Sequence, residues 1–343
     1  MRRVGHCVMV LFLLAFAVPN PAWAVEETSG AGGAKAILAA APGQGAVIGG
    51  SGEGFEPAAK AAIDEEIPAT FGPLVTDTAI PVEKGQFVVQ PTFAYSFVND
   101  RFGDDWHRGS AGGNYRAFSM DWKLAYGPMD NMEAFLVIPY AYNSARSVED
   151  TGPAGESSAN AGGLGDLNLT LKFRLVEETT CLPTVTALFA TDFPTGKFKD
   201  LNPHDLGTDA IGGGAFVFTP GFNLSKYISP FIVYANLWYS LQTSYTDDEG
   251  RQYPGDFVTF NLAAEYPITE KWIALLELTS YWGGGRLFGP STNVPRQSLV
   301  SVVPGIEYMA TDNFSVAAGV NIDIAGKNND AAISPILSMV YVF

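Results

Sequence analysis

Histidine is the residue type that would indicate hydrolytic chemistry here, because nucleophilic hydrolysis needs a base beside the nucleophile. Beyond the first 24 residues the chain has only His107 and His204. The phospholipase pattern of a histidine followed two positions later by serine is absent, because Gly109 occupies that position. Asp104 and Asp105 beside His107 could serve an omptin-like protease, although such loop clusters are more often only solvated. No ligand spacing accompanies either histidine, so we expect no enzyme, no metal site and no cofactor.

A second set of candidate residues is charged and lies at alternate positions within apolar stretches. Charges isolated in a narrow interior are costly, so we expect Lys172 and Arg174 to pair with the glutamates. These pairs could form a structural layer, or a constriction that selects solutes by charge and size. The constriction candidates are Lys123, Glu133, Lys172, Arg174, Glu265, Glu277 and Glu307, with Asp166 and Asp323 placed near the outer mouth.

The stretch from Gly165 to Leu175 shows which element must position these charges. Its odd positions are apolar apart from the glycine, and its even positions are polar or charged. Successive side chains of a strand point to opposite faces, so this stretch has one apolar and one polar face. The same period of two recurs along the chain, which is typical of an outer-membrane β-barrel, apolar toward lipid and polar toward the lumen.

The repeated pattern predicts an all-β fold, a transmembrane, antiparallel, up-and-down β-barrel of about twelve strands. No run reaches about 18 apolar residues, so a membrane-spanning helix is not expected, and only a closed barrel would pair every strand edge in lipid. Long connections alternate with short turns such as Ser225-Lys226-Tyr227. The expected strands are 86–98, 116–126, 132–142, 165–175, 183–193, 211–224, 230–245, 256–268, 272–282, 296–309, 314–324 and a last strand that ends at Phe343.

The two ends of the chain indicate export. Residues 1–24 are expected to be a signal peptide, with Arg2 and Arg3 at its start, an apolar centre and cleavage after Ala24. Residues 25–84 are rich in Ala, Gly and Pro, and we interpret them as a flexible periplasmic leader, with a plug in the lumen as the alternative. Residues 85–343 would then form the barrel. The apolar alternation up to Phe343 is expected to be the signal that the barrel-assembly machinery recognises.

Charge narrows the range of partners. Removal of Arg2 and Arg3 with the signal peptide changes the net charge from −16 to −18. A strongly acidic chain is a poor ligand for nucleic acid. The strand pattern places the chain in the lipid of the outer membrane of a Gram-negative bacterium. The expected ligand is a small-molecule solute.

Three short motifs resemble those of the family of meta-pathway phenol degradation proteins, often called transporters. They are Leu74-Val75-Thr76-Asp77-Thr78 followed by Lys84-Gly85-Gln86, Gly163-Leu164-Gly165-Asp166-Leu167, and Phe193-Pro194-Thr195-Gly196-Lys197. With the strand spacing, the resemblance covers about Phe71 to Phe343. It implies an outer-membrane barrel that passes hydrophobic or aromatic compounds.

A barrel of this size is expected to enclose a narrow passage, since the interior of an eight-stranded barrel is filled by side chains and that of a sixteen-stranded barrel is an aqueous channel. Inward aromatic and apolar residues could line a path for an aromatic solute or could simply fill space. They are Phe135, Val137, Trp238, Ile273, Leu275 and Tyr281. We therefore expect a passive channel or transporter for small hydrophobic or aromatic solutes. The alternative is a structural or adhesion barrel with a closed lumen, whose extracellular loops bind a partner.

Overall fold

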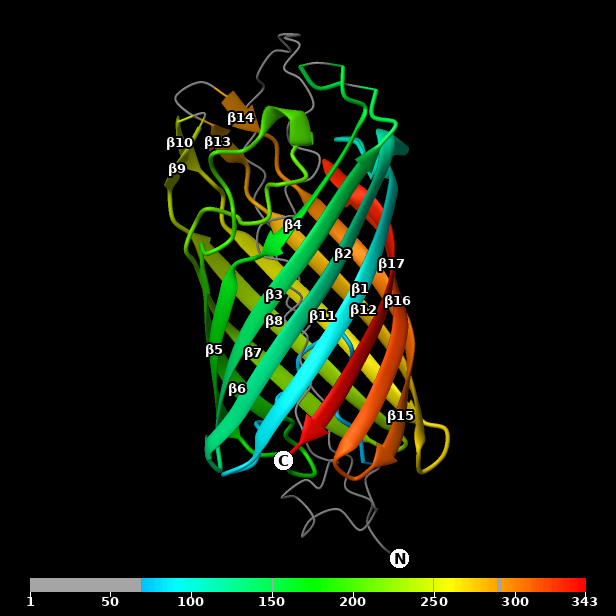
Figure 1. Cartoon of the computed structure of the whole chain (residues 1–343). Coiled ribbons are helices and arrows are strands. Elements are labelled where there is room, and N and C mark those ends of the chain that lie inside the picture. The colour runs from blue at the N-terminus through cyan, green and yellow to red at the C-terminus, as the bar shows by residue number, and fades with distance from the viewer. Residues whose placement is uncertain (1–68, 150, 154, 249, 289–291) are drawn as a thin grey trace, which may run out of the picture.

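A computed structural model of the chain describes residues 69–149, 151–153, 155–248, 250–288 and 292–343. These residues form a closed antiparallel barrel (Figure 1), in which β1 pairs with both β17 and β2, and β2 pairs with β3. The strands are β1 (Phe87–Phe102), β2 (Arg108–Met129), β3 (Met132–Arg146), β4 (Ser158–Leu164), β5 (Leu167–Val176), β6 (Thr184–Phe193), β7 (Val217–Ile228), β8 (Phe231–Gln242), β11 (Phe257–Pro267), β12 (Trp272–Gly283), β15 (Ser298–Thr311), β16 (Phe314–Lys327) and β17 (Asn329–Val342).

The barrel has twelve strand positions. β4 and β5 both pair with β3. β5 pairs with the first part of β3, Met132 to Val137, and β4 pairs with the last part, Tyr140 to Arg146, so together they occupy one position. Gly165 and Asp166 separate them. Every other pair of neighbouring strands in the ring is joined by an antiparallel ladder, some of them with a register shift, so the ring is closed. The predicted twelve-stranded fold is confirmed.

The alternation that predicted the barrel places side chains as expected. On β5, Leu169, Leu171 and Phe173 are 41–44% exposed on the outer surface, whereas Thr170 and Lys172 are fully buried inside. The apolar face therefore meets the surroundings of the barrel, and the polar face meets the lumen. No helix among the described residues is long and apolar enough to cross a membrane.

The longer connections gather at one end of the barrel, opposite the end where the C-terminus lies (Figure 1). Four short strands, β9 (Tyr245–Asp247), β10 (Gly250–Tyr253), β13 (Arg286–Phe288) and β14 (Thr292–Val294), form a small separate sheet in two of these connections. A short 3-10 helix, η2 (Pro203–Asp205), lies in the connection between β6 and β7. We refer to this end as extracellular and to the opposite end as periplasmic.

Several strand limits differ from the sequence-based prediction. β1, β2 and β3 extend into segments that we expected to be loops, and only Asn328 separates β16 from β17. These extensions lie at the extracellular end, where both faces of a strand can be polar, so the alternation that marks a strand disappears. The predicted turn at Ser225-Lys226-Tyr227 is wrong, because β7 stays paired with β8 as far as Ile228 and Phe231. The segment 211–216 belongs to the preceding loop.

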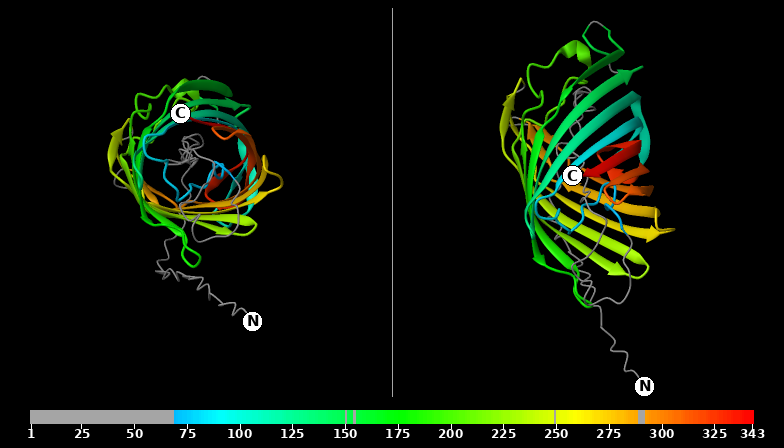
Figure 2. Two further views of the ribbon diagram at one scale, coloured as in Figure 1. Left: turned by 90° about the horizontal axis from the view of Figure 1, so that it is seen from below. Right: turned by 60° about the horizontal axis from the view of Figure 1, so that its bottom comes forward.

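Residues 69–84, here called the strap, lie inside the barrel (Figure 2, left). Phe71, Leu74, Ala79 and Val82 are all buried within it. The strap thus differs from a leader that stays outside the barrel, because its buried side chains and hydrogen bonds need the lumen wall. The expected signal peptide, residues 1–24, and residues 25–68 lie outside the described residues.

Candidate functional site

Two glutamates from the barrel wall hold the first half of the strap. Glu277 on β12 accepts hydrogen bonds from the backbone N–H of Leu74 at 2.7 Å and of Thr76 at 2.6 Å. Glu307 on β15 accepts one from the Thr70 hydroxyl at 2.7 Å and another from the Phe71 N–H at 3.2 Å. A segment that crosses a lumen has no neighbouring strand to satisfy its N–H groups. The carboxylates supply these acceptors, and charge-assisted bonds of this kind are strong.

A buried ion-pair network holds the second half. The Lys172 ammonium lies 3.1 Å from Asp77 of the strap and 3.4 Å from Glu133 on β3. Lys123 on β2 lies 3.3 Å from the other oxygen of Glu133. Glu133 also accepts a hydrogen bond from the Val82 N–H at 3.1 Å. The pairing of Lys172 with a glutamate is confirmed, and its second partner, Asp77, belongs to the strap.

Amide and hydroxyl side chains fix the middle of the strap. Asn236 on β8 accepts a hydrogen bond from the Asp77 N–H at 2.8 Å and donates one to the Asp77 carbonyl at 2.7 Å. Asn223 on β7 donates to the Asp77 carboxylate, and Ser225 accepts from the Ala79 N–H at 2.8 Å. Asp77 is therefore held by backbone, amide and ammonium groups together, which makes it the central anchor of the strap.

The wall also has a notch that receives an apolar side chain of the strap. Gly305 on β15 and Gly319 on β16 are paired across the ladder. A Cβ atom on these glycines would lie 2.9 Å and 2.5 Å, respectively, from the Leu74 Cδ1 atom. The absence of both side chains creates the space that Leu74 occupies.

The remaining predicted site residues have separate roles. Arg174 does not join the glutamates, so that part of the prediction is wrong. Its guanidinium donates to the carbonyl of Asp130 in the periplasmic turn between β2 and β3. Glu265 is buried on β11 and accepts a hydrogen bond from the Tyr234 hydroxyl at 3.0 Å.

The two predicted mouth residues stabilise the wall. The Asp166 carboxylate accepts hydrogen bonds from the N–H groups of Gly196 and Gly213, and so ties the β6–β7 connection to the break between β4 and β5. Asp323 on β16 is buried, and accepts from the Ser301 hydroxyl at 2.6 Å and the Ala332 N–H at 2.8 Å. Both carboxylates are thus engaged with the protein.

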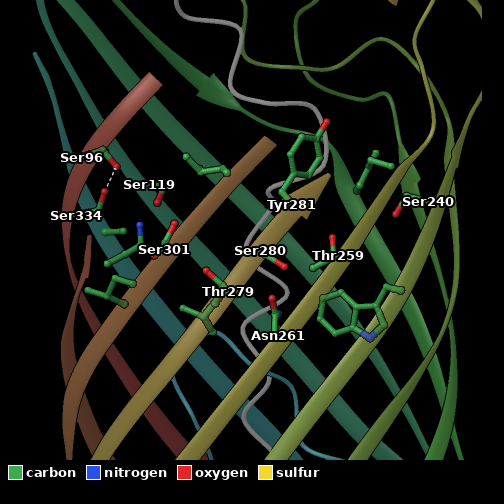
Figure 3. A pocket seen from close by; sticks show the side chains of 17 residues that line it. Ser96, Ser119, Ser240, Thr259, Asn261, Thr279, Ser280, Tyr281, Ser301 and Ser334 are labelled. Carbon is green, nitrogen blue, oxygen red and sulfur yellow. Dashed lines mark hydrogen bonds between the residues drawn. The ribbon is translucent and has the colours of Figure 1, made fainter. Parts of the chain in front are cut away.

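A cavity of about 220 Å³ lies in the lumen, with Val75 of the strap in its wall (Figure 3). Its lining has no charged side chain. Hydroxyl and amide groups share the surface with aromatic and aliphatic groups. The lining residues are Val75, Ala94, Ser96, Ser119, Trp238, Ser240, Phe257, Thr259, Asn261, Thr279, Ser280, Tyr281, Leu299, Ser301, Asn321, Ser334 and Ile336.

The inward aromatic and apolar residues that we expected along a solute path are therefore only partly in contact with this cavity. Trp238 and Tyr281 line it, whereas Phe135, Val137, Ile273 and Leu275 are buried in the apolar cluster that contains Phe71 and Leu74 of the strap. Sequence reasoning missed the strap contacts and the cavity hydroxyls. The motif around Asp77 was a signal for the strap. Single serines and threonines on inner faces carry no comparable signal.

The histidines lie apart from this lumen site. His107 is 3.0 Å from Asp105 in the connection between β1 and β2, and His204 is 2.6 Å from Glu156. The backbone N–H of His107 lowers the pKa of Asp105 below its ordinary value. Within the described ranges, no group of three or more His, Cys, Asp or Glu side chains could hold a metal ion.

Comparisons with known proteins agree with this architecture. The family model described as "Putative MetA-pathway of phenol degradation" matches residues 115–331, more than half of the chain. An outer-membrane channel from Pseudomonas putida F1 has 15% identity and a TM-score of 0.63, over 77% of this chain and 98% of that one. The translocator domain of the autotransporter NalP from Neisseria meningitidis has 13% identity and a TM-score of 0.46, over 75% and 88%. No curated protein sequence matched the chain.

Proposed function

We propose that this chain, which belongs to the phenol degradation family whose model matches it, is a passive outer-membrane channel for small, hydrophobic or aromatic solutes. The barrel fold is that of outer-membrane proteins, and the similar protein from P. putida is itself a channel. The mature chain would act without cofactor.

The observation that carries this proposal is the uncharged cavity in the lumen. Apolar and aromatic groups such as Trp238 and Tyr281 offer a solute surface to pack against. The lumen charges lie elsewhere, engaged with the strap or the wall. A neutral ring can therefore enter this space without leaving a charge unpaired, which favours such solutes over ions.

The strap adds a step to the passage. It lies across the lumen, and Val75 forms part of the cavity wall. A solute that moves from the cavity toward the periplasm meets the strap, so we propose that the strap shifts during transport. Many of its attachments are polar, and such contacts can exchange with water.

Uptake by porin-deficient Gram-negative cells that produce the full chain tests the channel. We expect faster uptake of radiolabelled 4-methylphenol than in cells without the chain. Thr279→Trp fills the cavity and should abolish the gain. Leu278→Trp places the same side chain at the neighbouring position on the outer face and should leave uptake unchanged.

The alternative of a closed adhesion barrel predicts a different result. Uptake that is equal with and without the chain, although the barrel is correctly inserted, would contradict the channel. Binding of an extracellular partner that is lost on replacing the small sheet β9–β10–β13–β14 would then favour adhesion.

Export and assembly complete the proposal. We propose cleavage after Ala24, which mass spectrometry of the mature chain would test by finding Val25 as the first residue. We also propose that the barrel-assembly machinery recognises β17, whose outward side chains Leu337 and Tyr341 are exposed. Tyr341→Ser should lower the yield of inserted barrel, whereas the inward change Ser338→Ala should not.

A further inference from the structure

The cavity contains polar groups that the protein itself does not use. Asn261 on β11 and Thr279 on β12 occupy directly paired positions, and Thr259 lies two residues from Asn261 on the same face (Figure 3). Within the described part of the chain, none of the three side chains has a hydrogen-bond partner. The Asn261 Oδ1 atom is buried and unpartnered. An unsatisfied buried polar atom costs about 1–3 kcal/mol, so a ligand that pairs with it gains affinity.

Several other polar groups of the lining are satisfied, whereas the Ser119 hydroxyl on β2 also has no hydrogen bond among the described residues. The hydroxyls of Ser96 and Ser334 bond to each other at 2.8 Å, and Ser240 bonds to Thr219 at 2.7 Å. Ser301 donates to Asp323. Most of the unused hydrogen-bonding capacity of the lining therefore lies on β11 and β12.

Two aromatic side chains flank the cluster. Thr259 is paired with Trp238 on β8 and with Tyr281 on β12, so the two rings lie on either side of it in the sheet. The Trp238 indole N–H donates to Asn223 at 2.8 Å, and the Tyr281 ring lies 5.1 Å from that of Phe257. These contacts fix both rings before any solute arrives.

Size and charge narrow the solute class further. An apolar cavity of about 150 Å³ is sufficient for benzene, and this cavity has about 220 Å³. It can therefore hold one substituted ring. Since its lining has no cationic side chain, a carboxylate would be buried without a partner.

We infer that this cavity binds an uncharged single-ring compound with a hydroxyl group, which Asn261 and Thr279 recognise through hydrogen bonds while Trp238 and Tyr281 contact the ring. The inference rests on the proposed function, because it names the solute class of the same lumen. It distinguishes a hydroxylated ring from a plain hydrocarbon, whose entry would leave the amide and hydroxyls unpaired.

Binding can be measured without transport, by saturation-transfer NMR on the full chain in nanodiscs. The probes are 4-methylphenol, toluene and 4-methylbenzoate, which share one ring and differ in one group, with glucose as a sugar probe. Near-isosteric Asn261→Leu and Thr279→Val remove the recognition groups, and Thr170→Val removes a lumen hydroxyl outside the cavity. The variants also correct for partition of each probe into lipid.

We expect saturable binding of 4-methylphenol in preference to the other probes. Each recognition variant should weaken it roughly three- to tenfold, the loss of one hydrogen bond, and Thr170→Val should not. Toluene or glucose binding as tightly as 4-methylphenol, or no effect of either recognition variant, would overturn the inference. Absence of binding with normal uptake would overturn the inference alone. Binding without uptake would instead contradict the proposed function.

Discussion

At the scale of single residues, the lumen charges act as anchors for the strap. Lys172 is fully buried between Asp77 and Glu133, and Glu277 and Glu307 accept N–H groups of the strap. Both hypotheses raised by the sequence, a structural layer and a constriction, assumed that the charges face each other or the solute. Four of them, Glu133, Lys172, Glu277 and Glu307, instead contact the strap.

Lys172→Met tests the importance of this cluster for stability. The variant leaves two buried carboxylates without their shared cation, and breaking such a pair costs about 3–5 kcal/mol. We expect a loss of that size in the free energy of unfolding, measured by urea titration of the barrel in lipid vesicles.

Arg174→Met is the matched control for that measurement. Arg174 is only partly buried and donates to one turn carbonyl, so its removal should cost less than about 1 kcal/mol. Equal losses for the two variants would show that the Lys172 network contributes no special stability.

The sequence predicted which residues face the lumen but not what they bind there. Alternation on a strand fixes the inward face of Lys123, Glu133 and Lys172, because a side chain has only two directions available. Partners within the lumen depend on a segment that has no such periodicity. The position of Arg174 at the rim follows from the irregular pairing between β5 and β6 at that point, which composition does not reveal.

At the scale of elements, the strap is the feature that sequence reasoning located least well. Its hydrogen-bond and ion-pair partners lie 51 to 237 residues away along the chain, on β3, β5, β6, β7, β8, β12 and β15. No local pattern encodes contacts at such separations. The strands were predictable because the side chains of each strand alternate between an apolar and a polar environment. Their limits failed at the extracellular end, where both faces can be polar, and at both ends of β7.

A disulfide across the strap tests whether it shifts. The hydroxyl oxygens of Thr78 and Ser225 are 3.4 Å apart, close enough for cysteines at these positions to be joined with little movement. In the Thr78→Cys/Ser225→Cys variant we expect oxidation to lower 4-methylphenol uptake and reduction to restore it. A variant with only one of the two added cysteines, beside the natural Cys181, should be insensitive to oxidant. Uptake that is unchanged by the disulfide would show that the solute passes while the strap stays in place.

The glycine notch provides an independent way to release the strap. Gly319→Val would occupy the space of the Leu74 side chain and should detach the first half of the strap. The expected result is faster hydrogen exchange of the Leu74 and Thr76 amides, measured by mass spectrometry. Val320→Ile, which adds bulk to the next residue on the opposite face, should leave these amides protected.

At the scale of the whole molecule, the barrel wall has one face toward lipid and one face toward the lumen, and the strap fills part of that lumen. The outer face needs apolar side chains around the full ring, and the inner face needs partners for every polar group. The first requirement acts on all twelve strands and is therefore visible in the sequence. The second is met at individual positions, by the strap, by paired hydroxyls and, at the β11–β12 cluster, by the inferred solute.

The need for apolar side chains on the outer face leads to the last prediction. Leu171 lies near the middle of β5 and Leu175 near its periplasmic end, on the same exposed face. An arginine costs about 2–4 kcal/mol at the bilayer midplane and about 0–1 kcal/mol near the interface. Relative to wild type, Leu171→Arg should therefore reduce the free energy of unfolding of the barrel in vesicles by about 2–4 kcal/mol, and Leu175→Arg should reduce it by at most about 1 kcal/mol. Equal effects at the two positions would mean that this face does not cross a hydrocarbon layer, and the channel proposal would fail with it.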